Sequence, residues 1–73
     1  MDNKILKSLR EDLIGEFEAI NQYQEHIDKI DDEEIKKVLG HIMDDEKEHV
    51  AELTKVIRKL DGTQEEKFQK EEL

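Results

Sequence analysis

The feature that most constrains the fold is the spacing of the apolar residues, which follow one another at alternating steps of three and four in two long rows. The first row consists of Leu6, Leu9, Leu13, Glu16, Ile20, Tyr23, Ile27 and Ile30. The second row consists of Ile35, Leu39, Ile42, Glu46, His49, Leu53, Val56 and Leu60. Residues at this spacing share one side of an α-helix and form the seam of a helical bundle. The sequence therefore predicts two long helices, each with one side that packs against another helix.

Acidic residues mark where the first helix ends and the second begins. Asp2 or Asn3 can cap a first helix that runs to about Ile30. The pair Asp31-Asp32 then interrupts the apolar pattern and offers the N-cap of a second helix. Because only a few residues connect the two helices, we expect an antiparallel hairpin.

The C-terminal part of the chain contains a second set of boundary signals. The second helix is predicted from about Glu33 to Leu60, and Asp61-Gly62 predicts its end, since glycine adopts the left-handed C-terminal cap most easily. The next residues, Thr63 to Glu66, fit the capping-box pattern and predict a short third helix. We therefore divide the chain into a helical hairpin at residues 1–61 and an acidic C-terminal tail or short helix at residues 62–73.

The size of the chain indicates that the hairpin does not act alone. With 73 residues and no cysteine, the chain is small for a domain stabilised by its own core, and disulfides cannot contribute. A bound metal or a partner chain remains as the means of stabilisation. A hairpin also offers each apolar row only one partner helix. We therefore predict an all-α fold in which the hairpin forms a homodimer with four helices in one bundle.

The charge of the chain excludes some classes of partner. The formal net charge is -9 and 45% of the residues are charged, so nucleic acid and anionic membrane surfaces would be repelled, whereas cations would be attracted. The N-terminal residues lack the basic and apolar segments of a signal peptide, and no apolar run approaches the roughly 20 residues that span a bilayer. We expect no nucleic-acid or membrane partner and a cytoplasmic location.

Two glutamates and a histidine interrupt the apolar rows: Glu16 in the first, Glu46 and His49 in the second. If the hairpin turns near Asp32, Glu16 lies 16 residues before the turn and residue 48 lies 16 residues after it. Both positions are then about 24 Å from the turn at the helical rise of 1.5 Å per residue. Glu46 and His49 are three residues apart and so share one side of their helix. The three side chains are therefore expected to converge.

A pair of such hairpins around a twofold axis would bring together four glutamates and two histidines, which is the ligand set of di-iron carboxylate bundles. Carboxylates can bridge two cations, and one imidazole per metal suits ions such as Fe(II). Four glutamates would offset the four positive charges of two Fe(II) ions, whereas the same site without metal would crowd like charges. Each chain is thus predicted to carry half of a di-iron site, and the metal is predicted to stabilise the assembly.

These residues resemble the two halves of the rubrerythrin and ferritin-like di-iron signature. The two matching motifs are Glu16-x-x-Ala19-x-x-x-Tyr23 and Asp45-Glu46-x-x-His49. A full-length ferritin or rubrerythrin carries this pair twice in one chain of four helices, whereas here it occurs once. The chain is most similar to the encapsulated-ferritin group, whose two-helix subunits build the ferroxidase centre at a dimer interface. The resemblance covers roughly residues 9–60.

The resemblance implies oxidation of Fe(II) by O₂, assembly of dimers into a ring, and often delivery into an encapsulin shell where the iron is stored. It implies that Glu16, Glu46 and His49 are metal ligands and catalytic residues of a di-iron centre shared between two subunits. It also implies a catalytic role for Tyr23 near those ligands and a secondary ion-uptake site that includes the exposed Glu18. The tail TQEEKFQKEEL differs from the family pattern, because it lacks the Gly-Ser-Leu type of peptide that directs cargo into the shell.

Other interpretations stay open at this stage. Glu16, Glu46 and His49 could set the register of a non-enzymatic oligomerisation module. Manganese could replace iron, and peroxide could replace O₂, as in a rubrerythrin-like peroxidase. The chain could be a fragment of a longer protein. Gly15 lowers helix propensity by about 1 kcal/mol relative to alanine, and it either lets a facing chain approach or is only tolerated.

Overall fold

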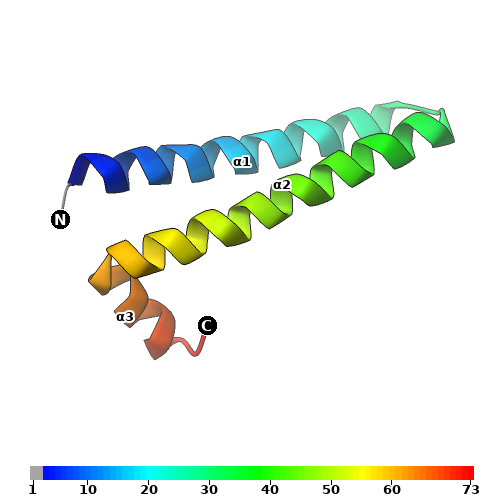
Figure 1. The fold of residues 1–73 in the computed structure, drawn as a ribbon. Helices are drawn as coiled ribbons and strands as arrows, with labels where there is room; N and C mark the ends of the chain where they lie inside the picture. Colours follow the sequence, from blue (N-terminus) through cyan, green and yellow to red (C-terminus); the bar gives the residue numbers. More distant parts are fainter. Residues whose placement is uncertain (1–2) are drawn as a thin grey trace.

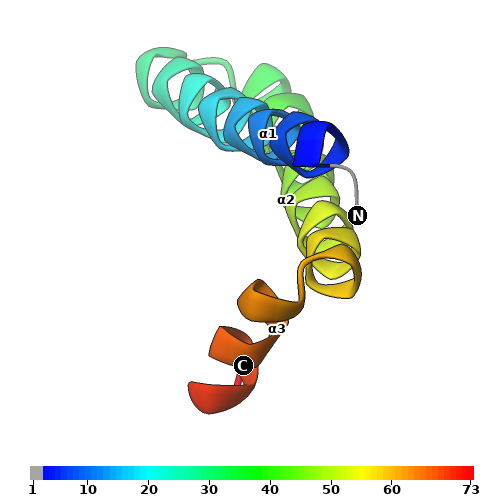
Figure 2. The ribbon, with the colours of Figure 1, turned by 90° about the vertical axis from the view of Figure 1, so that its left-hand side faces the viewer.

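The computed structural model describes residues 3–73, which form three helices and no strand (Figure 1). The helices are α1 (Asn3–Lys29), α2 (Glu33–Leu60) and α3 (Gly62–Lys70). α1 and α2 lie side by side in opposite directions, and α3 turns away from the end of α2 (Figures 1 and 2). The predicted all-α hairpin with a short C-terminal helix is confirmed. No helix of the described residues is long and apolar enough to span a membrane.

The connection between α1 and α2 is short because an aspartate caps the second helix. The carboxylate of Asp32 accepts hydrogen bonds from the backbone N–H groups of Glu34, at 2.9 Å, and Ile35, at 3.1 Å. These bonds satisfy donors that the first turn of a helix leaves without partners. The predicted N-cap is therefore confirmed. Of the two predicted caps of α1, Asp2 lies outside the described residues, and Asn3 is the first residue of the helix.

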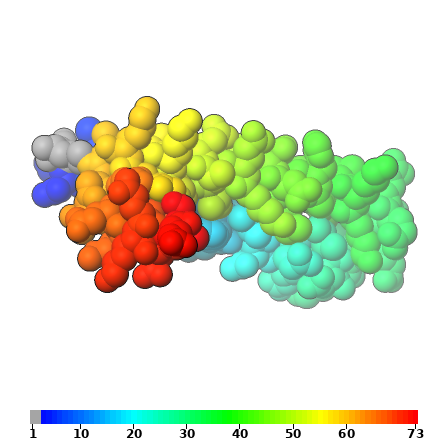
Figure 3. Space-filling view, turned by 90° about the horizontal axis from the view of Figure 1, so that it is seen from below, coloured from blue at the N-terminus to red at the C-terminus, as the bar shows by residue number. Residues whose placement is uncertain are grey.

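α1 packs against α2 through the predicted apolar row. Every member of that row, from Leu6 to Ile30, is buried or half-buried. The core is nevertheless thin, because Leu6 and Ile57 are the only buried residues between positions 3 and 73, and each is still 6% exposed. The described chain measures 47 × 27 × 14 Å, so it is elongated, and Figure 3 shows α3 gathered at one end of it.

Three of the eight residues predicted to face α1 from α2 are exposed instead, whereas the other five, Ile42 among them, are half-buried. The buried and half-buried residues at steps of three and four are Lys36, Leu39, Met43, Glu46, Val50, Leu53, Ile57 and Leu60. From the predicted row, Ile35 is 48% exposed, Val56 is 40% exposed, and His49 is also exposed. α2 is apolar over an arc wide enough for two adjacent rows, so spacing alone could not decide which row faces α1. His49 therefore lies at the edge of the seam and not within it.

Asp61 ends α2 and begins α3. Its backbone is extended, and its carboxylate accepts a hydrogen bond from the N–H of Gln64 at 3.2 Å. The same carboxylate pairs with the guanidinium of Arg10 in α1, at 2.8 Å. The prediction of a left-handed glycine cap was wrong, because Gly62 has no positive φ and is the first residue of α3. The predicted capping box was also displaced, since Asp61 caps α3 two residues before Thr63.

Arg58 links α3 to α2. The guanidinium of Arg58 donates two hydrogen bonds of 2.6 Å to the carboxylate of Glu65. It also lies over the ring of Phe68, 4.5 Å from the ring centroid, which is within the range of cation–π attraction. The hydrogen bond with Arg58 lowers the pKa of Glu65, so the pair stays charged at neutral pH. Arg58 thus orients the short helix α3, which has no buried residue of its own.

We expect Ile57→Ala to lower the free energy of unfolding by about 2–5 kcal/mol, because it removes buried methyl and methylene groups from the seam. Ile14→Ala makes the same change at a position that is 56% exposed. It should leave stability nearly unchanged or slightly raised, since alanine favours the helix. Thermal and urea unfolding followed by circular dichroism, in the presence of a chelator, compares the two variants. Equal losses of stability would contradict this assignment of the core.

Candidate metal site

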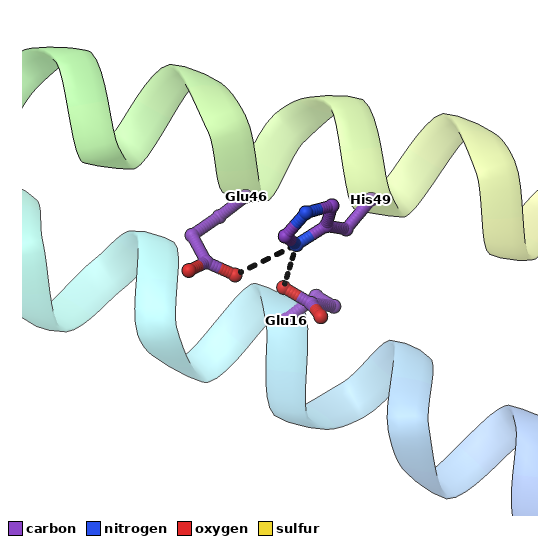
Figure 4. A group of neighbouring side chains, drawn as sticks. All are labelled: Glu16, Glu46 and His49. Carbon is purple, nitrogen blue, oxygen red and sulfur yellow. Dashed lines mark ion pairs between the residues drawn. The ribbon is translucent and has the colours of Figure 1, made fainter.

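The three polar residues of the helical rows converge near the middle of the hairpin. Glu16 comes from α1, whereas Glu46 and His49 lie one turn apart on α2 (Figure 4). Nδ1 of His49 lies 3.5 Å from Oε2 of Glu16 and 3.4 Å from Oε2 of Glu46. Each residue offers one ligand atom, and these atoms all lie within 4.8 Å of one another. The antiparallel register thus brings together the three residues predicted from their distance to the turn.

These separations fit the donor atoms of one metal ion. Ligand nitrogen and oxygen atoms lie about 2.1 Å from a zinc ion, so two ligands at a tetrahedral angle are about 3.4 Å apart. Hydrogen bonds between such atoms are usually shorter, at about 2.7–3.2 Å. The cluster therefore has room for a cation between its donor atoms. Within residues 3–73 it is the one group of three or more such side chains with this geometry.

Oε2 of Glu16 is the atom of the cluster that most needs a partner. It is buried and accepts no hydrogen bond, although the Glu16 side chain as a whole is 22% exposed. A buried carboxylate oxygen without a partner raises the free energy of the folded state. A cation between the three residues would remove that penalty, and two carboxylates with one imidazole suit first-row ions such as Fe(II), Mn(II) and Zn(II). Glu16, Glu46 and His49 thus fit a metal ion.

The protonation states of the three residues depend on one another. The neighbouring Glu46 carboxylate, followed by burial, raises the pKa of Glu16 above its usual value. The same contact lowers the pKa of Glu46, so Glu16 is the carboxyl that retains its proton more readily. Burial alone would lower the pKa of His49, but its contacts with Glu46 and Glu16 outweigh burial and raise it. A cation would therefore compete with protons for these groups.

The cluster opens into a groove on one side of the hairpin. The groove is lined by Glu16, Glu46 and His49 together with Glu11, Asp12, Gly15, Ala19, Glu52 and Leu53. His49 is the most exposed member of the cluster, with 49% of its side chain accessible, compared with 22% for Glu16 and 20% for Glu46. An ion or a second protein chain can therefore reach the cluster from this side.

Three acidic residues of the groove wall were not predicted as neighbours of the site: Glu11, Asp12 and Glu52. Asp12 lies four residues before Glu16, and Glu52 lies three residues after His49, so both are about one turn from the cluster. That spacing was the available signal, but 21 Asp and Glu residues in the chain make it unspecific. All three side chains are exposed and add negative charge that attracts cations to the groove.

Two residues that the family resemblance implied lie apart from the groove. Tyr23 is half-buried in the α1 row, seven residues from Glu16, which is about 10 Å along the helix. Glu18 is exposed, and neither residue is part of the groove lining in the described chain. A catalytic role for Tyr23 and an ion-uptake role for Glu18 stay predictions.

Comparison with known protein families decides which group this hairpin belongs to. The family model described as EncFtn-like matches residues 2–72, which include both long helices, the three-residue cluster and α3. The chain belongs to the EncFtn-like family. The predicted resemblance to encapsulated ferritins is thereby confirmed, and the match extends beyond the residues 9–60 on which it rested.

Two curated proteins of Myxococcus xanthus (strain DK1622) are similar to this EncFtn-like chain. The encapsulin nanocompartment cargo protein EncC is 41% identical over 63 residues, which cover 86% of this chain and 48% of EncC. The encapsulin nanocompartment cargo protein EncB is 34% identical over 58 residues, which cover 80% of this chain and 37% of EncB. The chain thus spans half or less of the length of these relatives. No solved structure matches it.

We expect Zn(II), used as a redox-inert probe, to displace protons when it binds this EncFtn-like chain near pH 7. The contacts with Glu46 and Glu16 raise the pKa of His49, so the metal-free imidazole keeps its proton to higher pH than usual, and a metal binds only the deprotonated group. Apparent affinity should therefore rise with pH and level off once the raised pKa of His49 has been passed. Calorimetry in two buffers with different protonation enthalpies measures the number of protons released.

His49→Ala should weaken Zn(II) binding by at least about tenfold and reduce the proton release, since it removes a ligand. His41→Ala serves as the matched control, because His41 is exposed on α2 and lies outside the groove. It should bind Zn(II) and release protons as the unmodified chain does. Identical proton release from the His49 variant and the unmodified chain would show that His49 is no ligand.

Proposed function

We propose that two copies of this chain form a ferroxidase centre in which Glu16, Glu46 and His49 of each copy bind Fe(II) while O₂ oxidises it to Fe(III). The observation that carries this proposal is the convergence of the three side chains around a buried carboxylate oxygen that has no hydrogen-bond partner. Iron is the substrate in this reaction, and its oxidation serves detoxification or storage.

The incomplete ligand set supports a dimer. One copy supplies two glutamates and one histidine, which is half of the set that di-iron carboxylate bundles use. Large apolar side chains also stay exposed on the single chain, among them Ile35, Val38 and Val56, which are 40–55% exposed. Ile35 and Val56 lie in one row along α2, seven residues to either side of Ile42 and His49, and a second chain can cover this row. A second hairpin would supply the remaining ligands and cover apolar surface at the same time.

The residue types suit the oxidation of iron. Two Fe(II) ions held close together can supply the two electrons that reduce O₂ to hydrogen peroxide, with two protons taken up. Hard carboxylate oxygens favour iron as its charge rises from +2 to +3, because their attraction grows with the charge of the ion. The four glutamates of a dimer would offset the four charges of two Fe(II) ions. Glu16 and Glu46 therefore stabilise the oxidised product more than the substrate.

An encapsulin shell is the proposed setting for this reaction. EncC and EncB are both named as encapsulin nanocompartment cargo proteins. A dimer or ring of narrow hairpins has no enclosed volume for mineral, so stored Fe(III) needs a separate compartment. We therefore place the chain, like these relatives, inside a shell in the cytoplasm. Its ring of dimers would act there as the oxidising component.

Glu46→Ala should reduce Fe(II) oxidation to the rate of protein-free buffer, because it removes one ligand from each half of the centre. Glu48→Ala is the matched control: it deletes the same side chain two residues away, where the glutamate is exposed and outside the groove. It should oxidise Fe(II) at the unmodified rate. The absorbance of Fe(III) after mixing with aerated buffer, together with O₂ consumption, measures both rates.

Unchanged oxidation by the Glu46 variant would overturn the proposal. Metal analysis of the unmodified protein provides a second criterion, since a shared two-metal centre requires two metal ions per dimer. If the chain binds no metal but still associates, it acts as the non-enzymatic oligomerisation module. If peroxide consumes bound Fe(II) faster than O₂ does, it acts as a rubrerythrin-like peroxidase.

We also expect Fe(II), added without oxygen, to raise the fraction of dimer and larger assemblies. Without metal, the glutamates of two copies would repel one another across the interface, and cations remove that repulsion. Light scattering of the same sample with Fe(II) and with a chelator measures the mass in each state. An identical mass in both conditions would contradict the coupling between metal binding and assembly.

A further inference from the structure

Gly15 has no evident function within the single hairpin. It lies in the interior of α1, where glycine is less favourable than alanine, yet it has no positive φ that would require glycine. A Cβ atom added at this position would meet nothing within 4 Å. The packing of α1 on α2 therefore gives no reason for a glycine at this position.

Gly15 lies at the groove into which the metal-site cluster opens. It precedes Glu16 and lines the same groove as Glu16, Glu46 and His49. Ala19, one turn further along α1, also lines the groove, so this part of the wall has small side chains and leaves the α1 backbone accessible. His49 is the member of the cluster that is most accessible from this groove.

The opposite wall of the groove continues into an apolar surface. Ile35, Ile42, His49 and Val56 follow one another at steps of seven residues and so share one side of α2. Ile35 and Val56 are among the exposed large apolar residues. The α1 wall of the groove thus contains the small residues Gly15 and Ala19 among its acidic residues, and the α2 wall continues into larger apolar residues. In a twofold dimer this surface would pack against the same surface of a second copy.

We propose that Gly15 is the point where α1 comes closest to the second copy, so that the absence of a side chain there sets the distance at which two half-sites join. This inference rests on the proposed dimeric centre, because a copy that completes the cluster has to cover the groove. In a twofold dimer the same surface of both copies takes part, so each interface contains two Gly15 residues. A methyl group added to the chain is therefore added twice to the interface.

The experiment compares alanine and leucine substitutions at two glycines. Gly40 is the matched control: it is helical, an added Cβ there also meets nothing within 4 Å, and it lies nine residues from His49. Nine residues are two and a half turns, so Gly40 and His49 lie on opposite sides of α2. Sedimentation equilibrium with and without Zn(II) measures the dimer dissociation constant of each variant, and circular dichroism of the metal-free chain measures folding.

Gly15→Ala should weaken dimerisation by at least about tenfold and Gly15→Leu by more, since overpacking of a close contact is strongly unfavourable. Both should keep or increase the helix content of the metal-free chain, which shows that folding is intact. Gly40→Ala and Gly40→Leu should leave the dimer dissociation constant within about twofold of the unmodified value.

Two results would overturn the inference while the proposed function stands. The first is a Gly15→Leu variant that dimerises as tightly as the unmodified chain, and the second is equal weakening by the Gly15 and Gly40 substitutions. In both cases the unmodified chain would still bind two Zn(II) ions per dimer. If the unmodified chain binds no Zn(II), or binds it as a monomer, the proposed centre fails and the inference about Gly15 fails with it.

Discussion

A hairpin of two helices has a single seam, and this constraint governs the rest of the structure. Each helix buries only the side that faces the other, so residues 3–73 contain just two buried side chains, Leu6 and Ile57. α2 carries a second apolar row beside the seam, in which Ile35 and Val56 stay exposed. The chain therefore has the surface for another interface and too small a core to be comfortably stable alone.

The polar cluster lies where the seam meets this second row. Glu46 belongs to the seam side of α2, whereas His49 belongs to the exposed row, so the pair crosses the boundary between them. Glu16 approaches from α1 and has one oxygen buried without a partner. The hairpin thus fixes the positions of three donor atoms and still leaves them open on one side. Under the proposed function, protons, metal ions and a second copy all act on this same cluster, so their binding is linked.

The features that depend on neighbouring residues or on regular helix geometry were predicted correctly from the sequence. Asp32 caps α2 as predicted, because capping depends on the few residues around it. The level of Glu16 relative to Glu46 followed from a constant rise per residue. The rotation of α2 about its own axis could not be predicted in this way. Ile42 and Met43 are adjacent and similarly apolar, so only the contact with α1 decides whether the row of Ile42 or the row of Met43 faces it. The end of α2 at Leu60 was predicted correctly, but the cap was not, because Asp61 takes that position and its contact with Arg10 joins residues 51 positions apart.

The contacts that hold α3 are separate from those that form the cluster. Arg58 lies nine residues after His49, which places the two on opposite sides of α2. The groove beside α3 is lined by Arg10, Leu13, Phe17, Thr54, Ile57, Gln64 and Phe68, none of which lines the groove of the cluster. Because α3 is attached through Arg58 and Asp61 on its own side, it leaves the cluster uncovered. The residues that hold the short helix are therefore distinct from the residues of the cluster.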